Sequence, residues 1–195
     1  MEPLTENGCS RVTDGNRSAS RTEIRLAGSG GQGLILGARI LLRALALEGK
    51  RVAQSQSYEP TSRGGFCFSD LVMSDESDYP LVTGLDVLVA LDQVGTDKSI
   101  ALVKPHALVI IDDHLVASRP HGDFTTQAFP MTERAKKIGS ARVANMVGLG
   151  ALVSIAKLCK PASLEAAIKL ETPKKFAELN LEAAKIGYAL ARNVH

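Results

Sequence analysis

The chain has 195 residues and a mass of 20.7 kDa, which suits a single domain with a short appendage. Hydrophobic residues make up 45% of the chain and charged residues 23%, a composition that excludes a disordered or fibrous protein. The net charge of +2 is too small for the chain to create an electrostatic field that would select nucleic acid or an anionic membrane. Its cysteines, Cys9, Cys67 and Cys159, lie too far apart for a zinc knuckle, an iron–sulfur cluster on this chain or a disulfide framework, and they fit a reducing cytoplasm.

The first 21 residues are predicted to form a tail that is disordered or bound to a partner. They are rich in Ser, Thr, Asn, Gly and Arg and show no apolar periodicity. No apolar stretch follows a basic start, as a secretory signal requires, and none reaches the roughly 18 apolar residues of a membrane span. We therefore expect one domain over residues 22–195, a cytoplasmic location and no membrane association.

Strand-like patterns alternate with turns through the first part of this domain. A glycine-rich turn follows the first strand and leads into an apolar helix over about residues 34–48, with one charged stripe. The fourth and fifth strands are continuous apolar runs that end in Asp, which is typical of parallel strands covered on both faces. The expected strands, in chain order, are Ile24–Ala27, Val52–Tyr58, Phe66–Met73, Asp86–Asp92 and Ala107–Asp112.

Helical patterns dominate the last third of the chain, and in the final helix apolar residues recur at steps of three and four. Thr132 and Ser163 are the expected N-terminal caps of the first and third of these helices. The expected helices are Thr132–Ile138, Val143–Leu158, Ser163–Leu170 and Lys175–Arg192. The whole pattern predicts a Rossmann-like α/β fold: a mostly parallel sheet flanked by helices, with a helical C-terminal layer.

The glycine-rich turn Gly28-Ser29-Gly30-Gly31-Gln32-Gly33 is the first motif with a chemical meaning. A strand that passes through such a turn into a helix directs backbone N–H groups and the positive helix end toward a point where an anion can bind. A dinucleotide site also needs an Asp or Glu near the end of the next strand, and residues 54–57 are Gln and Ser. NAD, another anion, a partner's backbone and a turn without a ligand all stay open as interpretations.

A second motif, Tyr58-Glu-Pro-Thr-Ser-Arg63-Gly64-Gly65, follows the second strand at the same edge of the predicted sheet. In open α/β sheets this edge carries the ligand crevice. The guanidinium of Arg63 beside two glycines suits a phosphate or a carboxylate, and it would equally hold the loop to neighbouring carbonyl groups.

Two clusters of charged residues have simpler interpretations. Asp112-Asp113-His114 stands at a strand end with no nucleophile nearby in sequence, so a structural role is expected. The basic residues at positions 134, 136, 137 and 142 suit either a solvated helix face or a contact with the phosphates of CoA.

Taken together, the motifs resemble the gamma subunit of the 2-oxoacid:acceptor oxidoreductases, from about Arg21 to the end of the chain. The Glu-Pro-Thr-Ser segment between Tyr58 and Arg63 is closer to the 2-oxoglutarate-like gamma chains than to the indolepyruvate ones. The motifs that carry the resemblance, by order and spacing, are Gly28–Gly33, Ser57–Gly65, Val72–Asp75, Asp86–Asp92, Ala144–Gly150 and Asn180–Ala183.

The resemblance implies a multi-subunit enzyme that oxidatively decarboxylates a 2-oxoacid such as pyruvate, 2-oxoglutarate or phenylglyoxylate to an acyl-CoA. Thiamine diphosphate and Mg would lie between alpha and beta subunits, and iron–sulfur clusters in other chains, including a ferredoxin-like subunit. Electrons would pass to ferredoxin, or to NAD through an additional flavin subunit. The gamma chain would dock onto the alpha subunit, help to shape the CoA approach, bind no cofactor alone and be inactive in isolation.

The site expectations follow from the motifs and the resemblance. We expect no catalytic residue and no metal ligand on this chain. The alternatives that stay open are a self-contained nucleotide-binding oxidoreductase and an interaction scaffold without a ligand. The candidates for contact with CoA, another anion or a partner subunit are Gly28, Gly30, Gly31, Gln32, Gly33, Tyr58, Arg63, Gly64, Gly65 and Asn145.

Overall fold

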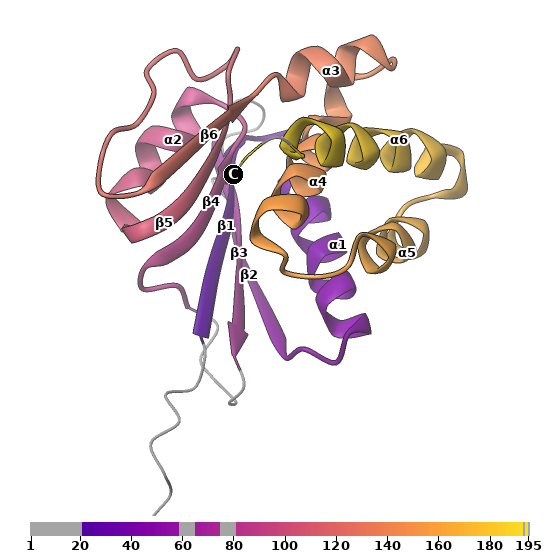
Figure 1. Cartoon of the computed structure of the whole chain (residues 1–195), viewed down its shortest axis with the longest axis horizontal. Helices are drawn as coiled ribbons and strands as arrows, with labels where there is room; N and C mark the ends of the chain where they lie inside the picture. The colour runs from indigo at the N-terminus through magenta and orange to yellow at the C-terminus, as the bar shows by residue number, and fades with distance from the viewer. Residues whose placement is uncertain (1–20, 59–64, 75–80, 193, 195) are drawn as a thin grey trace, which may run out of the picture.

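A computed structural model gives the architecture of the chain and describes residues 21–58, 65–74, 81–192 and 194 (Figure 1). The predicted tail, apart from Arg21, lies outside the described residues, as do Arg63 and Gly64. The first strand begins at Arg21, the last residue assigned above to the tail.

A six-stranded sheet, in the order β2-β3-β1-β4-β5-β6, forms the centre of the described part. β1, β4, β5 and β6 pair in parallel, whereas β3 is antiparallel to both of its neighbours, β1 and β2. Five strands therefore share one direction, which confirms the mostly parallel sheet. The strands are β1 (Arg21–Ser29), β2 (Val52–Tyr58), β3 (Phe66–Ser74), β4 (Leu85–Ala90), β5 (Val103–Asp112) and β6 (Thr125–Phe129).

Helices cover both faces of this sheet. Ile24 and Leu26 of β1 belong to the larger core, on the face that α1, α4, α5 and α6 cover, and α2 lies on the other face, against β1, β3 and β4 (Figure 1). The α-helices are α1 (Leu34–Leu47), α2 (Gln93–Ser99), α3 (Met131–Lys137), α4 (Ala144–Ala156), α5 (Pro161–Glu171) and α6 (Lys174–Ala191), and the 3-10 turns are η1 (Ile100–Leu102) and η2 (Ala141–Val143). The predicted helical C-terminal layer is therefore present. None of the described helices is both long and apolar enough to cross a membrane.

The predicted N-terminal caps are wrong. α3 begins directly after Pro130, and the backbone N–H of Thr132 donates instead to the carboxylate of Asp112, at 2.6 Å. α5 begins at Pro161, which places Ser163 inside the first turn, where its hydroxyl donates to Glu48 at 2.6 Å. In both helices a proline, whose φ is already near the helical value, marks the start, and the side chain of the N-cap residue itself makes no capping hydrogen bond.

α4 is buried along most of its length and crosses α6 at very short range. A Cβ atom added at Gly150 would lie 2.1 Å from the carbonyl oxygen of Ala184, and one at Gly187 would lie 2.1 Å from that of Val147. Both distances are far below van der Waals contact, so the two backbones touch where each lacks a side chain. This crossing fixes the N-terminus of α4 relative to α6.

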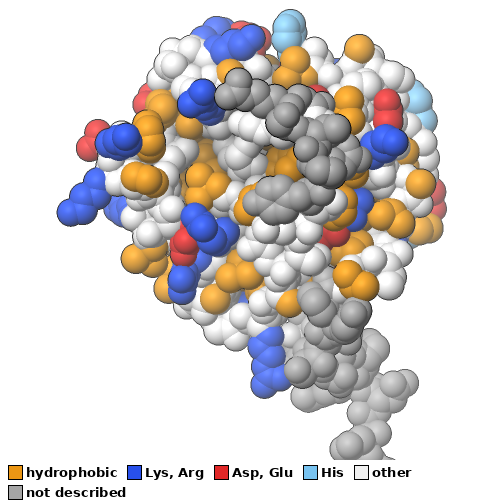
Figure 2. Space-filling model, turned by 180° about the vertical axis from the view of Figure 1, so that it is seen from behind, with side chains coloured by type: hydrophobic (Ala, Val, Ile, Leu, Met, Phe, Trp, Pro, Cys, Tyr) orange, Lys and Arg blue, Asp and Glu red, His pale blue; other side chains and the backbone are white. Residues whose placement is uncertain are grey.

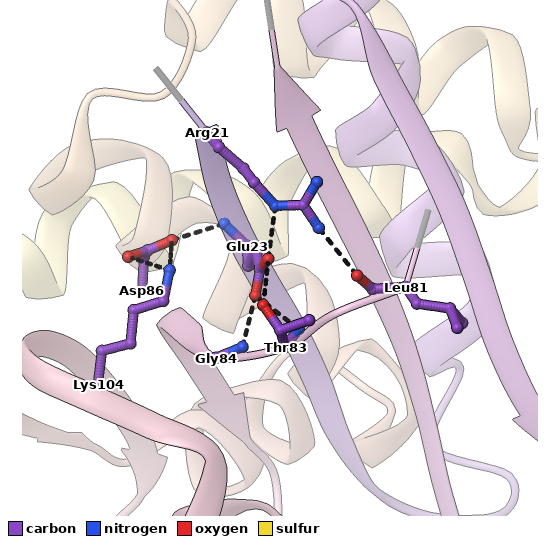
Figure 3. Close-up of polar contacts among 7 residues, drawn as sticks. All are labelled: Arg21, Glu23, Leu81, Thr83, Gly84, Asp86 and Lys104. Atoms are coloured by element: carbon purple, nitrogen blue, oxygen red, sulfur yellow. Dashed lines mark hydrogen bonds and ion pairs between the residues drawn. The ribbon is translucent and has the colours of Figure 1, made fainter. Parts of the chain in front are cut away.

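The N-terminal end of β1 is held by a buried carboxylate (Figure 3). Glu23 is 1% exposed, and it accepts hydrogen bonds from the backbone N–H groups of Thr83 at 2.9 Å and Gly84 at 2.6 Å. The guanidinium of Arg21 donates to the Glu23 carboxylate at 2.6 Å. The backbone N–H of Glu23 donates to the carboxylate of Asp86 at 2.8 Å. The start of β1 is thereby joined to the segment that leads into β4.

We predict that replacing Gly150 with Ala lowers the free energy of unfolding by about 1–3 kcal/mol, because the added methyl group forces the two helices apart. Urea denaturation measures this change. Gly148→Ala is the matched control on the same helix, because its nearest neighbours are the ends of the Met131 and Val89 side chains, at 3.0 and 3.2 Å, which can shift. Equal effects of the two substitutions would contradict the inferred backbone contact.

A second prediction concerns the pH dependence of stability. Burial alone would raise the pKa of Glu23, but hydrogen bonds from Gly84, Arg21 and Thr83 and the charge of Lys104 outweigh it and lower the pKa below its usual value. The resulting stabilisation is present above the unfolded pKa of about 4.3 and is lost as the pH falls through the lower pKa of the folded protein.

Glu23→Gln should therefore lower the free energy of unfolding at pH 7 by about 1–3 kcal/mol and flatten its decline in acid. Denaturant titrations between about pH 3 and pH 7 measure both effects. Glu182→Gln, which changes an exposed glutamate of α6, should keep the wild-type acid profile. An unchanged profile for Glu23→Gln would show that this carboxylate does not control acid stability.

Candidate functional site

The glycine-rich turn joins the carboxyl end of β1 to the start of α1, at the edge of the sheet where the sequence predicts a crevice. β1 ends at Ser29 and α1 begins at Leu34, and Gly33 between them has φ 73° and ψ 25°. This left-handed conformation disfavours any residue with a side chain, so a glycine is required at the start of the helix. The path of the turn therefore depends on the left-handed backbone conformation that Gly33 allows.

Most of the polar groups of this turn are bonded within the protein. The N–H of Ser29 donates to the side-chain oxygen of Gln32 at 2.8 Å, and the N–H of Gln32 donates to the carbonyl of Ser29 at 3.3 Å. The N–H of Gly30 donates to the carbonyl of Gly65 at 3.0 Å. An anion at this position could therefore bind only the N–H groups of Gly31, Gly33 and the first helical turn of α1. Fewer N–H groups are available than the glycine-rich sequence predicts.

Three of the predicted segments meet here. Gly65, from the second motif, touches the turn through Gly30, and the side-chain amide of Asn145 donates to the carbonyl of Gly33 at 2.8 Å. Tyr58 ends β2 and pairs with Cys67, which pairs in turn with Gly28, so the three strand ends lie side by side. The structure thus brings Gly28, Gly65, Tyr58 and Asn145 to one edge.

Asp92 is a residue of this edge whose role the sequence does not reveal. Its carboxylate accepts a hydrogen bond from the hydroxyl of Ser29 at 2.5 Å and another from the N–H of Gly95 at 2.8 Å, which caps α2. The side chain therefore connects the glycine-rich turn to the helix on the opposite face of the sheet. An Asp after an apolar strand is the only sequence signal for this connection.

Asp112 holds neighbouring backbone segments together. The Asp112 side chain is fully buried, and its carboxylate accepts hydrogen bonds from the N–H groups of His114, Leu115 and Thr132 at 2.6 to 3.1 Å. Burial, followed by the negative charges of Asp112 and Glu133, raises the pKa of the neighbouring Asp113. Backbone donors thus occupy the carboxylate of Asp112, which fits the structural role expected for this residue.

Two hollows open beside the turn and share Gly31 and Arg142 in their walls. The smaller, of about 200 Å³, lies among the carboxyl ends of the central strands and is lined by Gln32, Leu91 and Thr132 among others. The larger, of about 430 Å³, lies between the starts of α1 and α4 and the first turns of α6. Figure 2 shows Lys and Arg side chains gathered along the side of the molecule that carries α3, α5 and α6.

No metal ligand set is evident within the described residues, where no group of three or more His, Cys, Asp or Glu side chains lies close enough together to hold a metal ion. Cys67 and Cys159 are both free thiols there, and burial raises the pKa of each, that of Cys159 to about 11. These two thiols, as they lie in the described residues, do not fit a metal or an iron–sulfur cluster.

A family model described as pyruvate ferredoxin/flavodoxin oxidoreductase matches residues 23–190. The chain belongs to this family. Within it, the chain is a gamma subunit of a 2-oxoacid:ferredoxin oxidoreductase, as the sequence motifs predict. Gamma subunits work in multi-subunit enzymes with alpha and beta partners.

The relatives agree in sequence and in fold. The chain is 42% identical to 2-oxoglutarate synthase subunit KorC of Methanocaldococcus jannaschii, over 91% of this chain and 98% of that protein. It is similar to the keto/oxoacid ferredoxin oxidoreductase gamma subunit of Geobacter sulfurreducens, with a TM-score of 0.78 and 38% identity over 87% of this chain and 98% of that one.

A third relative is a much longer chain. The 2-oxoglutarate:ferredoxin oxidoreductase of Magnetococcus marinus, solved with 2-oxoglutarate, coenzyme A and succinyl-CoA bound, matches with a TM-score of 0.80 and 25% identity. The match covers 90% of this chain and 32% of that one, so the fold of this gamma subunit also occurs within a larger polypeptide.

We predict that Asp92→Ala lowers the free energy of unfolding by about 1–2 kcal/mol, because α2 loses its cap and Ser29 loses its acceptor. Hydrogen exchange should also become faster at residues 29–33. Asp97→Ala, at an exposed position of the same helix, serves as the control and should leave exchange in the turn unchanged. Unaltered exchange in Asp92→Ala would show that Asp92 does not support the turn.

Proposed function

We propose that this gamma subunit belongs to an enzyme that converts 2-oxoglutarate and CoA to succinyl-CoA and CO₂ and passes two electrons to ferredoxin. The observation that carries the choice of substrate is the near full-length match to a subunit of 2-oxoglutarate synthase at 42% identity. The Magnetococcus marinus relative, with 2-oxoglutarate and succinyl-CoA bound, supports the same reaction. None of the relatives named above points to a flavin or NAD subunit.

Within the complex, we propose that the chain helps assembly and contacts CoA at the carboxyl edge of its sheet. This edge joins Gly30, Gly65 and Asn145 through the hydrogen bonds described above and leaves Gly31 exposed. Ligands of open α/β sheets bind at this edge, and the N-terminus of α1 favours a phosphate there.

The chemistry itself is proposed to lie in the partner subunits, where thiamine diphosphate, Mg and iron–sulfur clusters would be bound. This chain would contribute binding and orientation only, which the occupation of the buried Asp112 carboxylate by backbone donors supports. The isolated chain is therefore proposed to be inactive.

A second candidate function is an interaction scaffold without a ligand at the glycine-rich turn. It is favoured by one observation, the internal hydrogen bonds that already occupy the N–H groups of Ser29, Gly30 and Gln32. The self-contained oxidoreductase considered above gains no such support.

The test is to purify the native complex through this chain, identify its subunits and assay it with CoA, ferredoxin and a panel of 2-oxoacids. We expect the highest kcat/KM for 2-oxoglutarate, compared with pyruvate, 2-oxoisovalerate and phenylglyoxylate, and no turnover by the isolated chain. A preference for another 2-oxoacid would overturn the choice of substrate, and turnover by the chain alone would overturn the accessory role.

The same complex separates the CoA contact from the scaffold. Hydrogen exchange at residues 30–33 and 58–65 should slow when CoA is added, while residues 125–129 of β6, at the far edge of the sheet, serve as the internal control. Unchanged exchange at both loops would favour the scaffold.

A further inference from the structure

Helix α1 carries charge on one side alone. Arg39 and Arg43 are the only charged residues of this helix, and they lie one turn apart. Their side chains are 54% and 51% exposed, and Leu47, one turn further along, is 51% exposed. Two arginines and a leucine therefore form one exposed stripe on a helix whose other sides mostly pack into the core.

One carboxylate from α5 holds both guanidinium groups in place. The Nε atom of Arg39 lies 3.0 Å from one oxygen of Glu171, and the Nε–H of Arg43 donates to the other oxygen at 2.9 Å. A single carboxylate neutralises only one of the two cations, so the three side chains together keep a positive charge. Within the described part of the chain, the terminal amino groups of the two arginines make no hydrogen bond. Each arginine therefore keeps the two-pronged edge with which a guanidinium binds a further carboxylate.

α5 adds a second apolar residue beside this pair. Leu170 directly precedes Glu171 and is 66% exposed. It lies two turns after Ser163 on the same side of α5, and the hydroxyl of Ser163 donates to Glu48, just beyond the end of α1. Leu170 is therefore on the flank of α5 that adjoins α1. We call the surface formed by Arg39, Arg43, Leu47 and Leu170 the arginine face.

The arginine face has the chemistry of a surface that binds another protein. Arginines beside large apolar side chains are enriched in protein interfaces, where guanidinium groups pair with carboxylates of the partner. Neither of the two hollows has Arg39 or Arg43 in its walls, and the pair lies on the outer side of a helix, which suits a small anion poorly. Nucleic acid requires a larger positive field than the net charge of +2 supplies.

We infer that the arginine face docks a partner subunit of the enzyme, on a surface that presents carboxylates to the two guanidinium groups and an apolar side chain to the two leucines. The inference rests on the proposed function only in its assembly role. Because Glu171 already orients both arginines, little side-chain freedom is lost when the partner binds. The arginine face is separate from the glycine-rich turn, since Arg43 lies about 14 Å along α1 from the first residue of the helix.

Analytical ultracentrifugation of the purified complex at several KCl concentrations tests the charged part of this face, because it gives the Kd of the chain for the other subunits. Arg39→Gln together with Arg43→Gln should raise this Kd by about tenfold or more at low salt and flatten its dependence on salt, since two ion pairs with the partner are lost. The matched control is Lys185→Gln together with Arg192→Gln, which removes the same charge from exposed positions of α6 and its C-cap. The control should keep the wild-type Kd and salt dependence.

Leu170→Ser tests the apolar part at a position where folding is not at risk. It should raise the Kd by about three- to tenfold and leave the salt dependence as in the wild type, because only apolar contact is lost. Val94→Ser, at an exposed position of α2 on the opposite face of the sheet, is its control and should leave the Kd unchanged. The thermal midpoint of each isolated variant chain should stay close to that of the wild type, since half-exposed ion pairs and exposed leucines contribute little to stability.

An unchanged Kd in the double arginine variant, or an equal rise in its α6 control, would overturn the proposal. Dimers of the isolated wild-type chain that the double arginine variant separates into monomers would also overturn it, because the arginine face would then bind a second copy of the chain. The 2-oxoacid preference of the complex is a separate measurement. A preference for a substrate other than 2-oxoglutarate would overturn the proposed reaction and leave the docking surface unaffected.

Discussion

Helices α4 and α6 touch through their backbones, because Gly150 and Gly187 leave no side chain between them. α4 is apolar on every side, so it can lie in the core with α1 and the sheet packed around it. Its N-terminus then reaches the glycine-rich turn, where Asn145 holds the carbonyl of Gly33. The position of the turn, the depth of the larger hollow and the placement of Asn180 all depend on how closely these two helices approach.

The carboxyl edge of the sheet is well ordered by its own hydrogen bonds. Gln32 closes the turn on itself, Gly65 ties the second loop to it, and Asp92 joins it to α2. A turn with so many internal bonds has fewer free N–H groups for a phosphate than its glycine content indicates. The turn is correspondingly held in one fixed conformation by the protein itself.

The sequence predicts the fold well where the pattern is local. The bounds of β2 are those expected. α1 and α6 follow from the spacing of their apolar residues, and α4 follows from a long stretch without charged residues. The reversed direction of β3 was not expected, although the connection over residues 59–65 is too short for a parallel crossover and so determines it. α2 was missed, because it is short, weakly apolar and capped by an Asp that ends an apparently longer strand.

The candidate site, like the fold, is predictable only where its signals are local in sequence. The glycine-rich turn and Asn145 stand out as motifs, but the bond from Gly30 to Gly65 and the meeting of Asn145 with Asn180 join residues distant in sequence. Such contacts depend on helix crossing and strand register, which no local pattern contains.

The Glu23 network fastens β1 at the end of the strand opposite to the glycine-rich turn (Figure 3). Whatever polypeptide precedes Arg21 is therefore attached on the side of the domain away from the carboxyl edge. Another polypeptide attached there would leave the carboxyl edge of the sheet uncovered. In the Magnetococcus marinus chain a domain of this fold makes up about a third of a longer polypeptide.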